Sequence, residues 1–167
     1  FISSVFADMK EGRNFTDLPD VDDGYNIHVI YALPSDGIDK EYDLTNQISM
    51  LVYQMDKWFN KKTKNRLFQD GQNLKFDRKE DGRIDISFLR MEIDNVSISK
   101  KGINAVNMIQ TEISRLGFND EKKVYFVVYG GSNKDVCASS QLPQHAPKSI
   151  VANTAAVLPY LASKISG

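Results

Sequence analysis

Two apolar segments constrain the fold of this 167-residue chain most strongly. YNIHVIYALP (residues 25–34) and KVYFVVYGG (residues 123–131) are rich in β-branched and aromatic residues, and turn residues bound them, as is typical of strands. Both carry apolar side chains at odd and at even positions, so we expect each strand to lie inside a sheet that is covered on both faces. The chain is therefore predicted to form a sheet with helices packed against it.

Two further segments have the periodicity of amphipathic helices. Residues 42–63 form one apolar stripe, made by Ile48, Leu51, Val52, Met55 and Phe59. Residues 97–118 form another, made by Ile103, Val106, Ile109 (or Met108), Ile113 and Leu116. We expect Asp43 or Thr45 to cap the first helix, and Gly117 to end the second with Phe118 as the following hydrophobic contact.

The segment between these helices, residues 73–91, predicts a hairpin. Asp81-Gly82 is typical of a two-residue type I′ turn, in which both central residues have positive φ. Beyond the turn, Ile84, Ile86 and Phe88 alternate with Arg83, Asp85 and Ser87, which predicts that one face of this arm meets water. Residues 138–167 give no clear assignment.

The predicted order is thus strand, helix, hairpin, helix, strand. Helices between strands imply right-handed crossovers, so the sheet is expected to be mixed, with at least part of it parallel. We predict an α/β fold of two or three layers with the helices packed on the sheet. The domain is expected to span residues 25–167, with a continuation beyond residue 167 left open.

Composition and net charge argue against some classes of binding partner but do not identify the partner. Apolar residues make up 41% of the chain and charged residues 26%, which is ordinary for one globular domain. A net charge of −1 argues against nucleic acid and anionic membrane surfaces, which attract clustered positive charge. No segment approaches the roughly 20 apolar residues of a membrane span. The expected partner is an unknown small molecule or peptide.

Residues 1–24 are predicted to be a leader followed by a polar loop. In FISSVFAD, Val5 and Ala7 occupy the −3 and −1 positions of a signal-peptidase site before Asp8. This pattern favours a secreted or periplasmic protein. The alternative is a short strand or helical turn at the start of a cytoplasmic protein. The single cysteine, Cys137, rules out an internal disulfide but leaves the compartment open.

The other clusters of charged residues are expected to be structural or solvent-exposed rather than functional. Residues 20–24, DVDDG, do not have the spacing of an EF-hand loop, so a solvated turn is expected. Asp77, Asp81 and Asp85 resemble a metal-binding group, but the spacing puts one of them in the turn and two on opposite arms, so surface charge is expected. His28 is expected to be a hydrogen-bonded structural residue. The basic run at residues 61–66 is expected at a helix C-terminus.

The candidate site lies after the two apolar strands. If these strands are parallel, the loops at residues 34–43 and 130–137 meet at one edge of the sheet, where α/β proteins bind ligands. We predict ligand-binding residues at Asp36, Asp39 and Asp135, with Gly130 and Gly131 allowing close approach of the backbone. The alternative is that Gly-Gly-Ser-Asn only forms a turn.

Catalytic and metal motifs are absent from the sequence. It has no P-loop, G-x-G-x-x-G, G-x-S-x-G or H-E-x-x-H pattern. A Cys137–His145 dyad, or a zinc site built on that pair, is the weak remaining idea. We therefore assign no catalytic residue, no metal ligand and no cofactor within this chain.

The stretches HVIYALPSDGIDKEYD, QISMLVYQMDKWF, LKFDRKEDGRIDISFLRM and KVYFVVYGG, in this order, resemble a poorly characterised group of secreted bacterial domains. Longer members look like zinc metallopeptidases with a histidine-bearing helix downstream, and the match covers about residues 25–137. The resemblance implies the N-terminal, non-zinc lobe of such a protein. Gly130 departs from the pattern, because an acid is expected there.

This resemblance leaves three functions open. The first is a binding or non-catalytic role for the exported domain. The second is a fragment of a zinc-dependent peptidase whose metal-binding helix lies beyond residue 167, so that zinc would belong to the longer protein. The third is an intracellular interaction domain.

Overall fold

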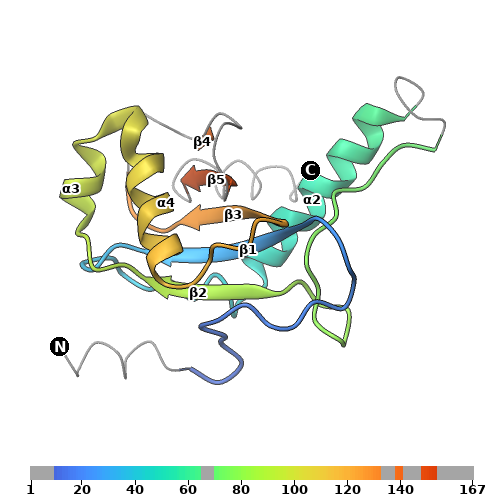
Figure 1. The fold of residues 1–167 in the computed structure, drawn as a ribbon, viewed down its shortest axis with the longest axis horizontal. Coiled ribbons are helices and arrows are strands. Elements are labelled where there is room, and N and C mark those ends of the chain that lie inside the picture. Colours follow the sequence, from blue (N-terminus) through green and yellow to red (C-terminus); the bar gives the residue numbers. More distant parts are fainter. Residues whose placement is uncertain (1–9, 65–69, 133–137, 141–147, 154–167) are drawn as a thin grey trace.

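The computed structural model describes residues 10–64, 70–132, 138–140 and 148–153 (Figure 1). In chain order its elements are β1 (Asn26–Leu33), α2 (Gln47–Thr63), β2 (Ile86–Arg90), α3 (Asn95–Ser99), the 3₁₀ turn η1 (Gly102–Asn104), α4 (Ala105–Arg115), β3 (Lys123–Tyr129), β4 (Ala138–Ser140) and β5 (Lys148–Asn153). The strands form one sheet in the order β2-β1-β3-β5-β4. All neighbours are parallel except β4, which is antiparallel to β5. The predicted α/β fold with a mixed sheet is confirmed.

The two apolar strands lie side by side and point the same way. β1 pairs with β3 over its length, with Val29 opposite Phe126, and pairs with β2 on its other side, with Tyr31 opposite Phe88. β1 is therefore an interior strand, as its two apolar faces predicted. The carboxyl ends of β1, β2 and β3 lie at one edge of the sheet, and their amino ends lie at the other.

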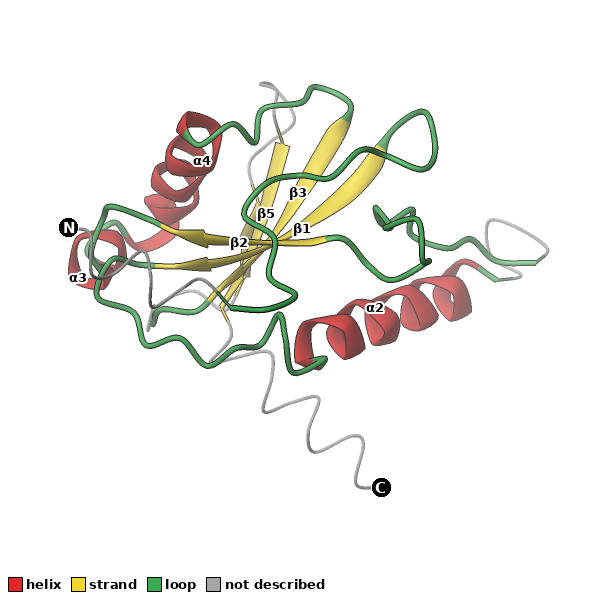
Figure 2. Ribbon diagram, turned by 90° about the horizontal axis from the view of Figure 1, so that it is seen from below, coloured by secondary structure: helices red, strands yellow, loops and turns green. Residues whose placement is uncertain are grey.

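Helices cover both faces of this sheet (Figure 2). On one face, Ile30, Ala32 and Val127 join a core with residues of α3 and α4: Ile98, Val106, Ile109 and Ile113. On the other face, Val29, Tyr31 and Leu33 join a core with residues of α2: Ile48, Leu51 and Val52. Burial of each such side chain contributes about 1.5–3 kcal/mol, so alternation along β1 stabilises both layers at once.

The first helix begins later than its pattern predicted. α2 starts after Asn46, which has a positive φ of 60° and makes no side-chain capping bond. Neither predicted cap acts there: Asp43 binds Arg13, and the Thr45 hydroxyl donates to the carbonyl of Glu41. The basic run does lie at the C-terminus of the helix, where Lys61 and Lys62 occupy the last turn.

The second predicted helix is divided in two. Gly102 has a positive φ of 52°, which interrupts the α-helical path and separates α3 from α4. The end of α4 is as predicted. Gly117 donates its N–H to the carbonyl of Ser114, and Phe118 donates to that of Ile113, which is the bonding pattern of a Schellman motif.

The hairpin differs from its prediction in two ways. Only Gly82 has positive φ in the turn; it donates to the Lys79 carbonyl, and Lys79 donates to that of Arg83. This is a three-residue loop with a glycine bulge rather than a two-residue type I′ turn. The predicted wet face of β2 is also wrong, since Asp85 is 1% exposed and Ser87 is 0% exposed.

An irregular N-terminal segment explains that burial. The carbonyl of Asn14 accepts the Phe88 N–H at 2.7 Å, and Asn14 forms a parallel bridge with Ser87. The carbonyl of Thr16 accepts the Ser87 hydroxyl at 2.9 Å. Residues 10–20, which we call the N-terminal strap, thus lie along the free edge of β2 and cover the face that the alternation had assigned to water.

The last described strands extend the sheet beyond β3. β5 pairs with β3 in parallel, and β4 pairs with the far side of β5. In the described part of the chain, no helix has the length and apolar character needed to cross a membrane.

Candidate functional site at the carboxyl edge of the sheet

The two predicted loops do meet at the carboxyl edge of the sheet. Gly130, directly after β3, donates its N–H to the Ala32 carbonyl of β1 at 2.8 Å. Ser35, after β1, donates its N–H to the carbonyl of Ile93, which follows β2, at 2.9 Å. The exits of three parallel strands are therefore tied together by backbone hydrogen bonds.

Asn95, the first residue of α3, joins the loops. Its backbone N–H donates to Asp36 Oδ1 at 2.8 Å. Its side-chain Oδ1 accepts from the Tyr129 hydroxyl and from the Ser132 N–H, both at 2.8 Å, and its Nδ2 donates to Ser132 Oγ at 3.0 Å. One side chain and its own amide thus fix the loop after β1 relative to the loop after β3.

The surface around Asn95 combines acidic and apolar groups. Asp36 is exposed, and Asp94 is partly exposed while it caps α3 by accepting from the Ser97 N–H and hydroxyl. Those hydrogen bonds lower the pKa of Asp94, so it is negative at neutral pH. Ile38 is 78% exposed and Val96 is 53% exposed. We name these four residues, with Asn95, the carboxyl-edge surface.

Tyr129 lies beneath this surface as a neutral phenol. Burial raises the pKa of its hydroxyl, and the nearby charges of Asp36 and Asp94 raise it further. The hydroxyl therefore serves as a hydrogen-bond donor to Asn95 at neutral pH.

Gly130 and Gly131 make their close approaches within the protein. A Cβ at Gly130 would overlap the side chain of Leu33, and one at Gly131 would overlap Asn95 and the Tyr129 hydroxyl. In the folded chain these glycines thus allow the loop after β3 to pack against side chains of β1, β3 and α3.

Asp39 belongs to a different cluster. It accepts from Arg13 Nη1 at 2.7 Å, and Asp43 accepts from Arg13 Nε at 2.7 Å. Burial would raise the pKa of Asp39, but the hydrogen bonds from Arg13 lower it. The Arg13 side chain is fully buried, with its guanidinium carbon 3.9 Å from the centre of the Phe88 ring. This contact anchors the N-terminal strap. Asp135, Cys137 and His145 lie outside the described residues.

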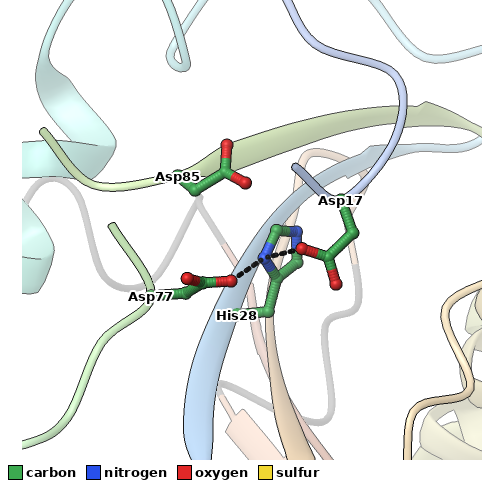
Figure 3. A group of neighbouring side chains, drawn as sticks. All are labelled: Asp17, His28, Asp77 and Asp85. Atoms are coloured by element: carbon green, nitrogen blue, oxygen red, sulfur yellow. Dashed lines mark hydrogen bonds and ion pairs between the residues drawn. The ribbon is translucent and has the colours of Figure 1, made fainter. Parts of the chain in front are cut away.

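A second cluster of ionisable residues lies at the opposite, amino edge of the sheet (Figure 3). Potential ligand atoms of Asp17, His28, Asp77 and Asp85 lie within 4.8 Å of one another. His28 Nδ1 is 3.1 Å from Asp77 Oδ2 and 3.3 Å from Asp17 Oδ1. The expectation of surface charge is wrong for Asp77 and Asp85, which are 3% and 1% exposed. Asp81 is exposed and pairs with Arg83. The expected hydrogen-bonded structural His28 is fully buried.

The residues of this amino-edge cluster do not fit a zinc site. Lys123 Nζ lies 2.7 Å from Asp17, 2.6 Å from Asp20 and 2.9 Å from Asp77. Burial would lower the pKa of Lys123, but these carboxylates raise it above its usual value, so an ammonium stands where a metal cation would. Zinc binding needs neutral histidine and carboxylate oxygens that are free to coordinate.

The same cluster contains the hydrogen-bond order of a catalytic triad. Asp77 faces His28 Nδ1, and His28 Nε2 is 3.0 Å from Ser87 Oγ. Ser87 and His28 are both fully buried, however, and the Ser87 hydroxyl donates to the carbonyl of Thr16 in the strap. No substrate can reach this serine in the folded chain, so the arrangement fixes the strap to the sheet.

Several residues of both clusters were not predicted. Asp94 could have been found, because Asp is a preferred N-cap residue and Asp94 directly precedes the segment Asn95-Val96-Ser97 that begins the helix. Asn95, Asp17 and Lys123 carry no such signal, since their partners are 34 or more positions away in the sequence.

Comparisons with known proteins give limited similarity. No protein-family model and no curated protein matches the sequence. Wild-type OgpA from Akkermansia muciniphila is similar in structure, with a TM-score of 0.48 and 13% identity, over 70% of this chain and 33% of that one. Catalytically inactive OgpA from the same organism, in complex with an O-glycopeptide (glycodrosocin) substrate, has a TM-score of 0.46 and 14% identity. That match covers 74% of this chain and 35% of the OgpA chain. This chain spans about a third of the length of those proteins.

Proposed function

We propose that this chain is an exported, non-catalytic binding domain that holds a peptide on the carboxyl-edge surface. The observation that carries the proposal is the bridge made by Asn95, which joins the two loops into a fixed surface. Asp36 and Asp94 offer negative charge there, and Ile38 and Val96 offer exposed apolar area. This combination suits a peptide with a basic side chain next to an apolar one.

Of the residues predicted from the sequence, Asp36, Gly130 and Gly131 take part in this proposal. Asp36 supplies the charge, and the two glycines let the loop after β3 lie close to Asn95. Asp39 faces Arg13 instead, and its role is to hold the strap. Asp135 comes three residues after Ser132 in the sequence and is proposed as an additional carboxylate.

The chemistry of the surface supports binding rather than catalysis. Its carboxylates accept hydrogen bonds, and its tyrosine is kept neutral by burial and by Asp36 and Asp94. Among the described residues, the one aligned Ser–His–Asp set is buried under the strap. Labelling of Ser87 by a serine-reactive fluorophosphonate in the folded protein would therefore contradict the proposal and favour a hydrolase.

The resemblance also suggests that the chain is one lobe of a zinc-dependent peptidase. The amino-edge cluster does not fit zinc, so in this second function we propose that the metal is held by residues outside the described part of the chain, on a helix beyond residue 167. In that case the carboxyl-edge surface would hold part of the peptide substrate. An H-E-x-x-H motif in the full reading frame would favour this second function over a free-standing binding domain.

The binding proposal is tested with a positional hexapeptide library and fluorescence polarisation. We expect enrichment of peptides with Lys or Arg beside a large apolar residue. Asp36→Asn keeps the acceptor for the Asn95 N–H but removes the charge, and should weaken the best peptide about three- to tenfold. Asp22→Asn, at another exposed acid, should leave its affinity unchanged. Equal affinity in the two variants would sink the proposal. Sequencing of the mature amino terminus tests export, with Asp8 expected as the first residue.

A further inference from the structure

A pocket of about 530 Å³ lies on the α2 side of the sheet, away from the carboxyl-edge surface. Four parts of the chain line it: residues 43–46, α2, the hairpin at residues 76–86, and residues 11–13 of the N-terminal strap. This volume is in the range of small-molecule sites. Neither the sequence patterns nor the proposed peptide surface accounts for it.

Apolar side chains form the inner part of the pocket. Val52 is 2% exposed, Phe76 is 6% exposed and Ile86 is 8% exposed, and Ile84 packs against the same core. These residues belong to the core between α2 and the sheet, so they are held by packing on their other sides. They can accept the apolar body of a ligand without rearrangement of the fold.

The hairpin supplies positive charge to the lining through Arg78, Lys79 and Arg83. Two of these cations already have partners, because Arg78 donates to the Gly82 carbonyl and Arg83 pairs with Asp81. Lys79 is partly buried, and its ammonium has no hydrogen bond or ion pair within the described residues. Lys79 interacts at longer range with the exposed carboxylate of Asp81, which pairs directly with Arg83. A partly buried cation that no carboxylate contacts directly, at the border of an apolar pocket, is suited to an anion.

The acids of the lining compete little for Lys79. Asp43 is bound to Arg13, and Asp56 accepts the Leu74 N–H at 2.6 Å. Glu11 is exposed on the strap. The first turn of α2 adds to the positive potential, because Asn46 and Ser49 line the pocket and that turn holds no acidic residue.

We propose that this pocket binds a small organic anion with an apolar body, such as an aliphatic carboxylate, with its carboxylate on Lys79. The apolar chain lies against Val52, Phe76 and Ile84. The Lys79 ammonium supplies the charge contact, and Ser49 and Asn46 can donate further hydrogen bonds. This site is separate in residues and in position from the carboxyl-edge surface, so each of the two proposals can fail without the other.

Three probes with one chain length test this assignment: octanoate, 1-octanol and octylammonium, titrated into ¹⁵N-labelled protein and followed by NMR. Octanoate should bind with a Kd of about 1 mM and shift the amides of Val52, Tyr53, Phe76 and Ile84. 1-Octanol should bind about fivefold more weakly and octylammonium more weakly still. The proposal would be overturned if 1-octanol or octylammonium bound as tightly as octanoate or more tightly. It would also be overturned if the amide shifts were confined to other residues, or if octanoate did not bind at a concentration about 20-fold above the expected Kd.

Matched variants separate the charge contact from simple burial. Lys79→Met should weaken octanoate about fivefold and leave 1-octanol unchanged, whereas Lys122→Met, at an exposed lysine outside the pocket, should change neither. Ser49→Phe fills the pocket from the partly exposed face of α2 and should abolish binding of octanoate and 1-octanol together. An unchanged octanoate Kd in either Lys79→Met or Ser49→Phe overturns the assignment.

Discussion

The two edges of the sheet use the same residue types for opposite purposes. At the amino edge, Asp77 and Asp85 are buried; Asp77 bonds to His28 and pairs with Lys123, and Asp85 accepts the Leu18 N–H of the strap. At the carboxyl edge, Asp36 is exposed and the loops are held by the hydrogen bonds of Asn95, one of which goes to Asp36 itself. Burial therefore decides the role of a carboxylate here: the amino-edge carboxylates fix the fold, and the carboxyl-edge carboxylates remain available to a partner.

The N-terminal strap causes this difference. It covers the amino edge and removes water from the charges there, so each buried charge needs a hydrogen-bond or ion-pair partner within the protein. In the described part of the chain, no segment covers the carboxyl-edge surface in this way, and Ile38 and Val96 remain exposed. The comparison predicts large stability effects at the amino edge and small ones at the carboxyl edge.

The largest effect is expected from Lys123→Met, which keeps the unbranched side chain through Cε but removes the charged ammonium. Asp17, Asp20 and Asp77 would lose their shared cation, and leaving a buried charge unpaired costs about 3–5 kcal/mol. Urea unfolding measures the loss. Lys122→Met, at the exposed neighbour, should change the free energy of unfolding by less than about 0.5 kcal/mol. An equal loss of unfolding free energy in Lys123→Met and Lys122→Met would show that the charge of Lys123 has no special role in the stability of the amino edge.

An intermediate effect is expected from pH. Burial would raise the pKa of Asp77, but hydrogen bonds from His28 and Lys123 lower it to about 2, below the unfolded value. Asp77 therefore contributes stability that is present above about pH 4 and lost as the pH falls towards 2. Asp77→Asn should remove a slope worth on the order of 1–2 kcal/mol across this window.

The free energy of unfolding at a series of pH values measures this slope. Asp17 acts in the opposite sense, because burial raises its pKa and the charge of Asp77 raises it further. The difference in slope between wild type and Asp77→Asn therefore reports Asp77 together with its effect on Asp17. Asp22→Asn removes an exposed carboxylate outside the cluster and should keep the wild-type profile. The same acid slope in wild type and Asp77→Asn would show that the amino-edge cluster does not depend on this charge.

The smallest effect is expected at the carboxyl edge, from the Asn95–Tyr129 hydrogen bond. A double-mutant cycle with Asn95→Ala and Tyr129→Phe should give a coupling energy of about 1 kcal/mol, as for a neutral hydrogen bond. The pair Asn95→Ala and Tyr125→Phe serves as the control, because Tyr125 bonds to Asp120 instead, and should be additive. A coupling as large as the loss in Lys123→Met would show that the two edges are equally dependent on polar contacts.

Local patterns predicted most of the framework. β1 and β3 were recognisable because both of their faces are apolar, and the end of α4 because Gly117 and Phe118 form a Schellman motif. The meeting of the two loops followed from the parallel direction of the strands. The predicted caps of α2 failed because Asp43 was recruited by Arg13, a residue 30 positions away in the sequence.

Sequence by itself determined that the segments of β1, α2, β2, α4 and β3 become strands and helices, and that both faces of β1 and β3 are buried, because periodicity is a local property of the chain. Only the tertiary structure decided which charged and polar side chains are buried and which are exposed. Asp85 and Ser87 alternate as solvent-facing residues do, but they are buried because the strap pairs with β2 from more than 70 positions away. The burial of a charged side chain depends on contacts with residues far away in the sequence, and these contacts produce no periodic pattern. The buried carboxylates of the amino edge could therefore be distinguished from the exposed ones of the carboxyl edge only in the folded molecule.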